Sequence, residues 1–318
     1  MQNILIRADS SFDIGTGHIM RDLVLATQYT DATITFATRE LNGNINDKIT
    51  NAGYGVYILK SDDVNELISL IHTMKIDMLI VDHYGIGLED EEKIKKEATV
   101  TLMVLDDLYN KHHCDVLLNH NVYAESPKYY DLVPLDCEVR CGIQYTLLRD
   151  EFLRKSTTVR GGIDKRLKLF LAMGGADSKS MNLSILNIIY ALDIEIHIVS
   201  THANKHLAKL EVFVKKHENM HLHIDAKNIV DIIDICDVAL VTPSVMVNEI
   251  IFLGIPFISI MVTDNQFYMY EFLKERGFPT INKTEIVSLP EMIKAYYEKN
   301  YFQMQVNKIE KILQLRIN

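Results

Sequence analysis

The sequence has few cysteines, no long apolar run and fewer basic than acidic residues, and each shortage narrows the possible functions. Its 4 cysteines form no CxxC pair, so they supply neither a disulfide framework nor the spacing of a zinc knuckle. No stretch approaches the roughly 18 apolar residues of a membrane span, and the N-terminus lacks the basic and apolar regions of a signal peptide. We therefore expect a cytoplasmic protein with reduced, mostly packed cysteines and no membrane partner.

The charge balance disfavours an extended nucleic-acid partner. Lys and Arg number 33 against 43 Asp and Glu, which gives a formal net charge of −10. Duplex binding depends on clustered basic side chains that release counterions. A nucleotide-sized anion, in contrast, can be held by backbone N–H groups and helix N-termini. We therefore expect a small-molecule partner and no nucleic acid.

The pattern of apolar residues predicts an α/β protein. With 318 residues, 48% of them hydrophobic, the chain is long enough for two domains that each bury a core. Short apolar runs alternate with amphipathic helical patterns, which is typical of parallel sheets covered by helices on both faces. In the first half, the predicted strands are 3–7, 33–37, 54–59, 78–82 and 100–107.

The alternation stops near residue 150 and resumes at Lys168. The polar, glycine-containing segment 151–166 between these points is the predicted linker. Beyond it we predict strands at 169–173, 195–200, 221–224, 238–241 and 257–261. Helices are predicted from about Ser178, Asn204 and Ser244, and from Pro290 onwards.

The predicted organisation is therefore two open parallel-sheet domains, 1–150 and 151–318, the second ending in a helical tail. Two open parallel-sheet domains in tandem place an interdomain cleft at the carboxyl ends of their strands, where such sheets bind ligands.

A glycine-rich turn follows the first strand of each predicted domain. Gly15 and Gly17 make a tight loop before His18, which opens a helix, and Gly174 and Gly175 follow strand 169–173. Such turns let backbone approach a ligand, and a helix N-terminus favours developing negative charge. The spacing is neither a GxGxxG dinucleotide site nor a P-loop. A tight turn that merely places a histidine at the start of a helix is an open alternative.

Polar residues also follow later strands of the second half. Ser244 begins a predicted helix that carries Asn248 and Glu249 in its first turn and a half. A carboxylate there can accept two hydrogen bonds from the diol of a ribose, although simple helix capping is the alternative. Asn265 and Gln266 follow strand 257–261, where polar side chains can reach a ligand.

The segment from His112 to Asp115, with His113 and Cys114 between them, contains metal-binding residue types. Adjacent side chains point in different directions, and no second cluster completes a tetrahedral set. We therefore predict no metal ligands and no cofactor.

Several segments occur together in one order: RADSSFDIGTGHIMRDLVLA, IVDHYGIG, GGAD, SVMVNE and DNQ. Over about residues 3–278 they resemble the UDP-sugar hydrolase family of pseudaminic acid biosynthesis. That family removes UDP from UDP-2,4-diacetamido-2,4,6-trideoxy-β-L-altrose, and its fold is similar to that of the GT-B glycosyltransferases, in particular the GlcNAc transferase that makes lipid II. The resemblance implies two Rossmann-like domains in a GT-B arrangement, nucleotide in the C-terminal domain and a link to flagellin glycosylation.

The resemblance also implies roles for individual residues. His18 would activate water, with Gly15, Gly17, Arg21 and Tyr84 as further substrate-binding residues. In the second domain, Gly174 and Gly175 would approach the diphosphate and Glu249 the ribose. The rest of the polar pocket would be formed by Ser244, Val245, Asn248, Asn265 and Gln266.

The predicted reaction is attack by water that His18 has deprotonated. An ordinary imidazole is suited to this task near neutral pH, and Asp13 or another acid near the same loop could orient it. Water attacking opposite UDP inverts the anomeric centre, and helix dipoles and backbone donors could stabilise the leaving diphosphate without a metal. The alternatives are a glycosyltransferase and a non-catalytic UDP-sugar-binding protein. The predicted partners are the UDP-sugar and UDP, and the predicted form is a monomer.

Overall fold

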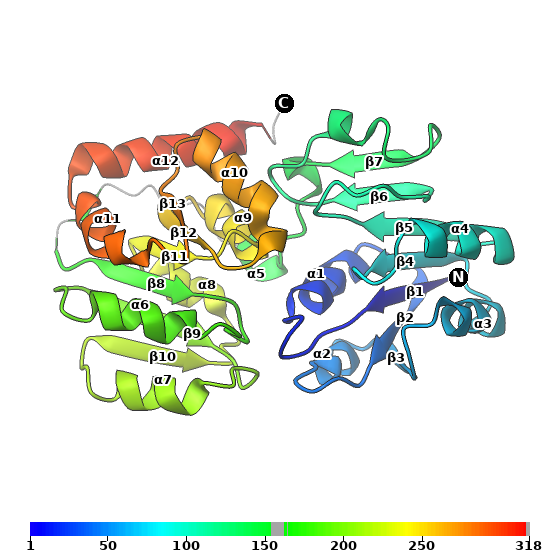
Figure 1. Cartoon of the computed structure of the whole chain (residues 1–318), viewed down its shortest axis with the longest axis horizontal. Helices are drawn as coiled ribbons and strands as arrows, with labels where there is room; N and C mark the ends of the chain where they lie inside the picture. Colours follow the sequence, from blue (N-terminus) through cyan, green and yellow to red (C-terminus); the bar gives the residue numbers. More distant parts are fainter. Residues whose placement is uncertain (154–161, 164, 316–318) are drawn as a thin grey trace. The chain divides into compact units, whose positions relative to one another are not determined.

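The computed structural model describes residues 1–153, 162–163 and 165–315, which divide into two compact units, Met1–Leu147 and Leu148–Asn318. Each unit is a parallel sheet with helices packed against it (Figure 1). Much of the predicted linker lies outside the described residues, and its first residues belong to the short helix α5 (Asp150–Leu153).

The N-terminal unit contains a seven-stranded sheet with the order β3-β2-β1-β4-β5-β6-β7, in which every pairing is parallel. Its strands are β1 (Gln2–Ala8), β2 (Ala32–Arg39), β3 (Gly55–Leu59), β4 (Met78–Asp82), β5 (Thr101–Leu105), β6 (Val116–Asn119) and β7 (Glu138–Cys141). Its helices are α1 (Gly17–Ala26), α2 (Asn46–Asn51), α3 (Val64–Met74), α4 (Leu88–Glu97) and the 3-10 turns η1 (Ser126–Tyr129) and η2 (Ile143–Tyr145).

The core of this unit fixes helix α1 against the sheet. Ile4 and Ile6 of β1 and Ile80 of β4 are fully buried and share one apolar cluster with Ile19 and Leu25 of α1. Strands covered on both faces bury nearly every side chain, which explains the continuous apolar runs in β1 and β4. The packing therefore holds the first turn of α1 at the carboxyl end of β1.

The C-terminal unit contains a six-stranded sheet with the order β10-β9-β8-β11-β12-β13, again with parallel pairings. Its strands are β8 (Lys168–Ala172), β9 (Glu195–Ser200), β10 (Met220–Ile224), β11 (Val238–Val241), β12 (Phe257–Met261) and β13 (Thr280–Asn282). Its helices after α5 are α6 (Met181–Ile189), α7 (Leu207–Val214), α8 (Ile229–Asp234), α9 (Val245–Phe252), η3 (Asp264–Gln266), α10 (Phe267–Glu275), η4 (Ile286–Ser288), α11 (Leu289–Ala295) and α12 (Lys299–Gln314).

The predicted helical tail is α11 and α12, and it belongs to the core of this unit. Phe302 and Val306 of α12 are buried in the same apolar cluster as Leu169 of β8 and Ile196 of β9. Tyr296, fully buried, donates a hydrogen bond from its hydroxyl to the carbonyl of Phe257 at 2.7 Å. The tail therefore contributes to folding of the second sheet.

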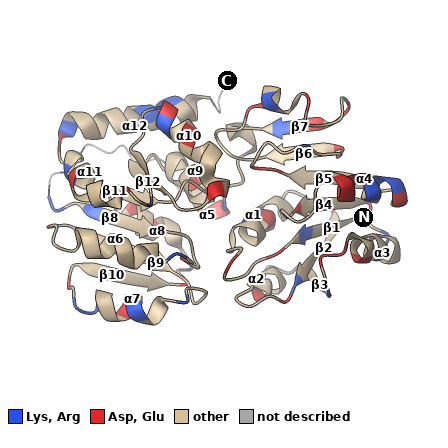
Figure 2. Ribbon diagram, viewed as in Figure 1, with Lys and Arg blue, Asp and Glu red and all other residues tan. Residues whose placement is uncertain are grey.

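Acidic and basic side chains are interspersed over the ribbon (Figure 2). Helix α4 shows the pattern locally, with Glu89, Asp90 and Glu91 in its first turn and Lys95 and Lys96 in its last. This order complements the helix dipole. Among the described residues, no helix is both long and apolar enough to cross a membrane.

The α/β class and all the predicted strands are confirmed, but the sequence analysis missed β6, β7 and β13. Two helices begin three residues later than predicted, α6 at Met181 and α7 at Leu207. Ser178 is not the cap of α6, because the Asp177 carboxylate accepts the N–H groups of Met181 and Asn182 at 2.7 and 3.0 Å.

Candidate functional site

The strand order of the N-terminal sheet reverses between β1 and β4. From β1 the chain builds outwards through β2 and β3, then returns to the other side of β1 with β4 and β5. In open α/β sheets, ligands bind at the carboxyl ends of the strands where the order reverses. The loop after β1 that carries Gly15 and Gly17 therefore lies at the usual ligand position of its sheet.

His18, the second residue of α1, makes a buried contact with Asp82 at the end of β4. The His18 Nδ1 atom lies 2.7 Å from Asp82 Oδ1, and the histidine is 8% exposed. Burial alone would raise the pKa of Asp82, but Arg21 and His18 hold it well below its usual range. An ionised carboxylate only accepts hydrogen bonds, so Nδ1 is the donor, and the tautomer of the neutral ring that fits this contact has its lone pair on Nε2.

Arg21 and Tyr84 complete this arrangement. Arg21 Nε donates to Asp82 Oδ2 at 2.6 Å, its Nη2 contacts the other oxygen of Asp82, and its Nη1 donates to Asp107 at 3.2 Å. The hydroxyl of Tyr84 donates to Asp107 at 3.0 Å, and its ring meets the His18 imidazole edge-on with centroids 5.0 Å apart. The structure thus brings His18, Arg21 and Tyr84 together, whereas their roles towards a substrate stay predictions.

The acid that contacts His18 Nδ1 differs from the one predicted. We expected Asp13 or another acid near the same loop, but the contact is made by Asp82, 64 residues from His18 in sequence. Because β4 pairs in parallel with β1, with Ala8 opposite Asp82, the carboxylate comes to the start of α1. The sequence analysis assigned a role in the IVDHYGIG segment only to Tyr84 and not to Asp82.

The loop before His18 is closed on itself and leaves open space beside it. Ser11 and Gly15 exchange backbone hydrogen bonds of 2.9 and 3.2 Å, and Gly15 has φ of +86°, which favours glycine. A Cβ added at Gly15 or Gly17 would meet no described atom within 4 Å. The backbone at both glycines is therefore accessible to a ligand.

Asp22 and His120 lie close to the His18 group and were not predicted. Both are buried, and neither the Asp22 carboxyl oxygens nor the His120 ring nitrogens have a hydrogen-bond partner among the described residues. Burial, and then the nearby Asp82, raises the pKa of Asp22 well above its usual value. Burial, and then Arg21, lowers the pKa of His120 to about 3. Burial therefore favours the neutral form of both side chains.

Several charged side chains also surround Asp9, which comes just after β1. Its carboxylate accepts hydrogen bonds from Arg7 at 2.7 and 2.9 Å and from Arg39 Nε at 2.8 Å, and His83 lies 3.2 Å away. Asp62 joins the same group through Arg7 at 2.9 Å. Asp9, Asp62 and His83 have metal-binding side chains, but two guanidinium groups already neutralise the carboxylates, so this position disfavours a cation.

In the C-terminal sheet the strand order reverses between β8 and β11. The loop after β8 carries Gly174, whose φ is +83° and whose Cα has open space around it. The carbonyl of the next residue, Gly175, accepts hydrogen bonds from the backbone N–H and the hydroxyl of Thr201 at 3.2 and 2.9 Å. Burial raises the pKa of Asp177, which follows in this loop, to about 6.

Helix α9 starts at the carboxyl end of β11, after its N-cap residue Ser244. Val245 is its first residue, and Asn248 and Glu249 are buried in its second turn. Glu249 Oε1 accepts a hydrogen bond from Arg149 Nε at 2.8 Å, a partner that the sequence did not reveal. Burial raises the pKa of Glu249, and Arg149 partly opposes this shift.

Asn265 and Gln266 lie in η3, beyond the carboxyl end of β12. The side-chain oxygen of Gln266 accepts the N–H groups of Val262 and Thr263 at 2.8 and 3.3 Å, so it serves the local backbone. Asn265 Oδ1 accepts from the Thr263 hydroxyl at 2.6 Å. Both side-chain oxygens are engaged inside the loop, and a role of these residues in substrate binding stays a prediction.

The segment that begins at His112 forms ion pairs. His112 Nδ1 lies 2.7 Å from Glu91, and its Nε2 lies 3.5 Å from Asp106. Burial alone would lower the pKa of His112, but these two acids raise it to about 9. The sulfur atoms of Cys114 and Cys137 lie 3.7 Å apart, and no disulfide joins any of the 4 cysteines.

No protein-family model matches the sequence. Among solved structures, MurG from Acinetobacter baumannii matches 99% of this chain and 95% of its own, with a TM-score of 0.62 and 12% identity. The spinosyn rhamnosyltransferase SpnG, complexed with thymidine diphosphate, matches 98% of this chain and 96% of its own, with a TM-score of 0.58 and 11% identity. The chain therefore has the GT-B fold, with two Rossmann-like domains, as the resemblance implied.

A curated relative narrows the class further. The UDP-2,4-diacetamido-2,4,6-trideoxy-β-L-altropyranose hydrolase of Campylobacter jejuni is 41% identical over 275 residues, which is 86% of this chain and 97% of the relative. The chain belongs to this hydrolase family. The resemblance found in the sequence is thereby confirmed, whereas the roles of individual site residues stay predictions.

Proposed function

We propose that this protein hydrolyses UDP-2,4-diacetamido-2,4,6-trideoxy-β-L-altropyranose and releases UDP, as a step of pseudaminic acid biosynthesis. The name and 41% identity of the Campylobacter jejuni relative support the substrate. The observation that carries the chemistry is the 2.7 Å contact between His18 Nδ1 and Asp82, which leaves Nε2 as a base.

The proposed reaction breaks the bond between the anomeric carbon and the UDP oxygen. Water gives a proton to His18 Nε2 while its oxygen attacks the anomeric carbon from the side opposite UDP. The electron pair of the broken bond leaves with UDP, and the configuration inverts. Asp82 stabilises the imidazolium that forms, because it already accepts the Nδ1 proton.

The nucleotide is proposed to bind at the switch point of the C-terminal sheet. The open backbone around Gly174 suits a diphosphate, and α9 directs its N-terminus to the same edge, since β8 and β11 are neighbours. Glu249 is the proposed acceptor for the ribose hydroxyls. Arg149 donates a hydrogen bond to Oε1 of this carboxylate, so ribose would bind beside an existing ion pair.

The reaction is proposed to need no metal. Arg21 donates hydrogen bonds to Asp82, the acid that contacts His18, and to Asp107. A divalent cation at this position would compete with a buried guanidinium for the same oxygens. The leaving diphosphate can instead be stabilised by backbone donors and helix termini.

The test is UDP release from a panel of UDP-sugars, followed by reaction in ¹⁸O-labelled water. The proposal expects fastest turnover of the altrose derivative, label in the free sugar, and the inverted anomer in early NMR spectra. Label in UDP would mean attack at phosphorus and would remove His18 from its role. Activity that appears only when an acceptor alcohol is added would favour a glycosyltransferase, the alternative that the GT-B fold supports.

A further inference from the structure

Strands β9 and β10 carry a cluster of histidine and glutamate side chains that the proposed hydrolysis does not use. Along both strands, apolar residues alternate with metal-binding ones: Ile196 and Ile198 face the core, and Glu195 and His197 face the other side of the sheet. On β10, Met220 and Leu222 pack with the core, and His221 and His223 take the opposite face.

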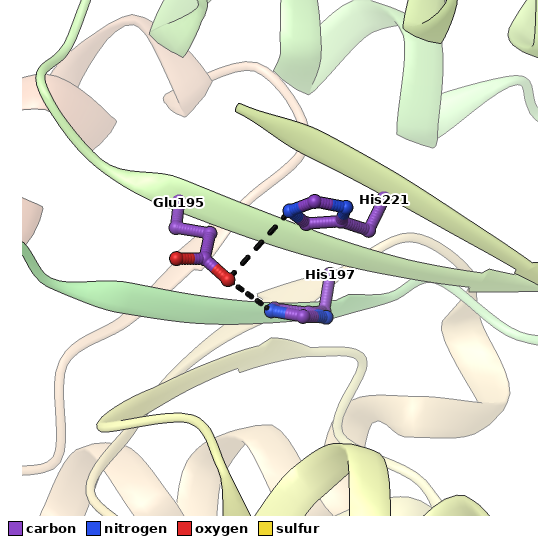
Figure 3. Close-up of side chains that lie close together, drawn as sticks. All are labelled: Glu195, His197 and His221. Carbon is purple, nitrogen blue, oxygen red and sulfur yellow. Dashed lines mark hydrogen bonds and ion pairs between the residues drawn. The ribbon is translucent and has the colours of Figure 1, made fainter. Parts of the chain in front are cut away.

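The strand register brings these side chains together. His197 and His221 are directly opposite each other in the parallel pairing of β9 with β10. Glu195 Oε1 lies 2.9 Å from His197 Nε2 and 3.6 Å from His221 Nε2, and the potential ligand atoms all lie within 4.8 Å of one another. Figure 3 shows the carboxylate turned towards both imidazole rings. We propose that Glu195, His197 and His221 bind a zinc-class divalent ion.

The geometry and ligand types fit such an ion. Bonds of 2.0–2.2 Å in a tetrahedral site place ligand atoms roughly 3.3 Å apart, so small side-chain rotations bring the three atoms into range. Imidazole with one carboxylate suits zinc, copper or nickel and is a poor match for magnesium or calcium, which take oxygen ligands. Three protein ligands leave the fourth position to water.

His223 is placed to orient one of the ligands. Its Nε2 lies 3.1 Å from Nδ1 of His197, on the side away from Glu195. When Nε2 of His197 binds the ion, the Nδ1 atom of His197 carries the proton and donates a hydrogen bond to His223. This hydrogen bond fixes the tautomer of His197. His197 itself is 5% exposed, whereas the His221 side chain is 44% exposed and gives the ion a path from solvent.

Lys168 allows a test in which a substitution should strengthen binding, because its amino group competes with the ion for Glu195. Its amino group lies 3.7 Å from the same Glu195 oxygen, and its side chain is 41% exposed. An ion that binds must displace this ammonium group. Lys168→Gln removes the competitor and should therefore strengthen binding severalfold, whereas a cluster with only a packing role would not respond in this way.

The position of the site favours a structural role for the ion, separate from hydrolysis. β10 is an edge strand, and it pairs with β9 alone. An ion shared by His221 of β10 and two residues of β9 would tie that edge to the sheet. The amino-terminal half of β9 also lies away from the carboxyl-end loops that carry Gly174 and Ser244.

The experiment is calorimetric titration of zinc into the untagged full-length protein after treatment with a chelator and dialysis. We expect one ion per chain, and at least about tenfold weaker binding in His221→Gln and Glu195→Gln. His202→Gln is the matched control, because His202 also pairs with a carboxylate, Asp225, but belongs to no three-ligand group among the described residues. It should bind as the parent does.

Thermal unfolding gives a second reading that is independent of catalysis. At free zinc about 100 times its dissociation constant, the parent should unfold roughly 5–10 °C higher, and His221→Gln should show no such rise. The proposal is overturned if the parent shows no saturable binding, or if His221→Gln and Glu195→Gln bind zinc as tightly as the parent and His202→Gln.

Discussion

The role of Asp82 leads to a prediction for a double-mutant cycle with His18. In the structure, Asp82 accepts hydrogen bonds from His18 Nδ1 at 2.7 Å and from Arg21 Nε at 2.6 Å. Asp82→Asn keeps the shape of the side chain but replaces one accepting oxygen by a donating NH₂ group. His18 then loses either its orientation or the tautomer that leaves Nε2 free.

The expected losses can be worked out for each step. Removing or misdirecting a general base costs about 10²–10⁴-fold in kcat, so Asp82→Asn and His18→Gln should each lower kcat at least about 100-fold, or about 2.7 kcal/mol. Asp82→Asn should also destabilise the fold, because breaking a buried ion pair lowers the free energy of unfolding by about 3–5 kcal/mol. The lower end applies here, because Asp107 still faces Arg21 at 3.2 Å in Asp82→Asn.

The assay is steady-state UDP release by the parent, both single variants and the double variant, with UDP affinity measured by calorimetry. If Asp82 acts through His18, the double variant should be no slower than His18→Gln, and UDP affinity should stay within a few-fold of the parent. Asp115→Asn is the control, since Asp115 pairs with Lys95 at 2.7 Å in the same unit, and it should leave kcat unchanged. Multiplying losses in the double variant would refute the reasoning, as would a parallel loss of UDP binding.

Glu249→Ala should weaken UDP binding by about tenfold or more, because a ribose contact to a charged acceptor is worth about 1.5–3 kcal/mol. Arg149→Ala, which removes the 2.8 Å ion pair but keeps the carboxylate, should lose less, and full UDP affinity in Glu249→Ala would exclude this residue from the site. Excess EDTA should lower the unfolding temperature through the β9–β10 site yet leave the hydrolysis rate nearly unchanged, and a rate that vanishes and returns with a divalent ion would contradict the proposed mechanism. His112, whose pKa is raised to about 9 by Asp106 and Glu91, should stabilise the fold fully below about pH 6.5, and this contribution should be lost as pH rises through 9. Urea unfolding should show a decrease of about 3 kcal/mol over that range that is absent in His112→Gln, and equal pH slopes would show that His112 does not contribute.

Local patterns were enough to predict most of the fold, and the missed strands show where they fail. The strand β13 contains only Thr280–Asn282, which is too short to show alternation. The strand β6, Val116–Asn119, is a short apolar run, and periodicity alone does not distinguish such a strand from another buried segment. The edge strand β7, Glu138–Cys141, carries the charged residues Glu138 and Arg140, since an edge strand need not be buried on both faces. These strands are specified by their neighbours in the sheet.

The candidate site also has features that local patterns reveal and features that they do not. His18 and its glycine loop were recognisable because a strand, a tight turn and a helix follow one another directly in the sequence. The contacts of His18 with Asp82 and of Glu249 with Arg149 join residues 64 and 100 positions apart. Such pairs depend on which strands are neighbours, and a local pattern carries no record of strand order. Gln266 shows a local contact that the sequence analysis did not include, because its side-chain oxygen accepts the N–H of Val262 in its own loop.

The separate cores of the two units have a consequence for how specificity can change. Ile4, Ile6 and Ile80 hold α1 and its histidine in place, whereas Leu169 and Ile196 belong to the cluster beneath the proposed nucleotide loops. The stability of the region around His18, the proposed sugar-binding side, thus depends on one core. The stability of the proposed nucleotide-binding loops depends on the other core. In evolution, or in a laboratory selection for new donor sugars, each half can accumulate changes while the other keeps its stability.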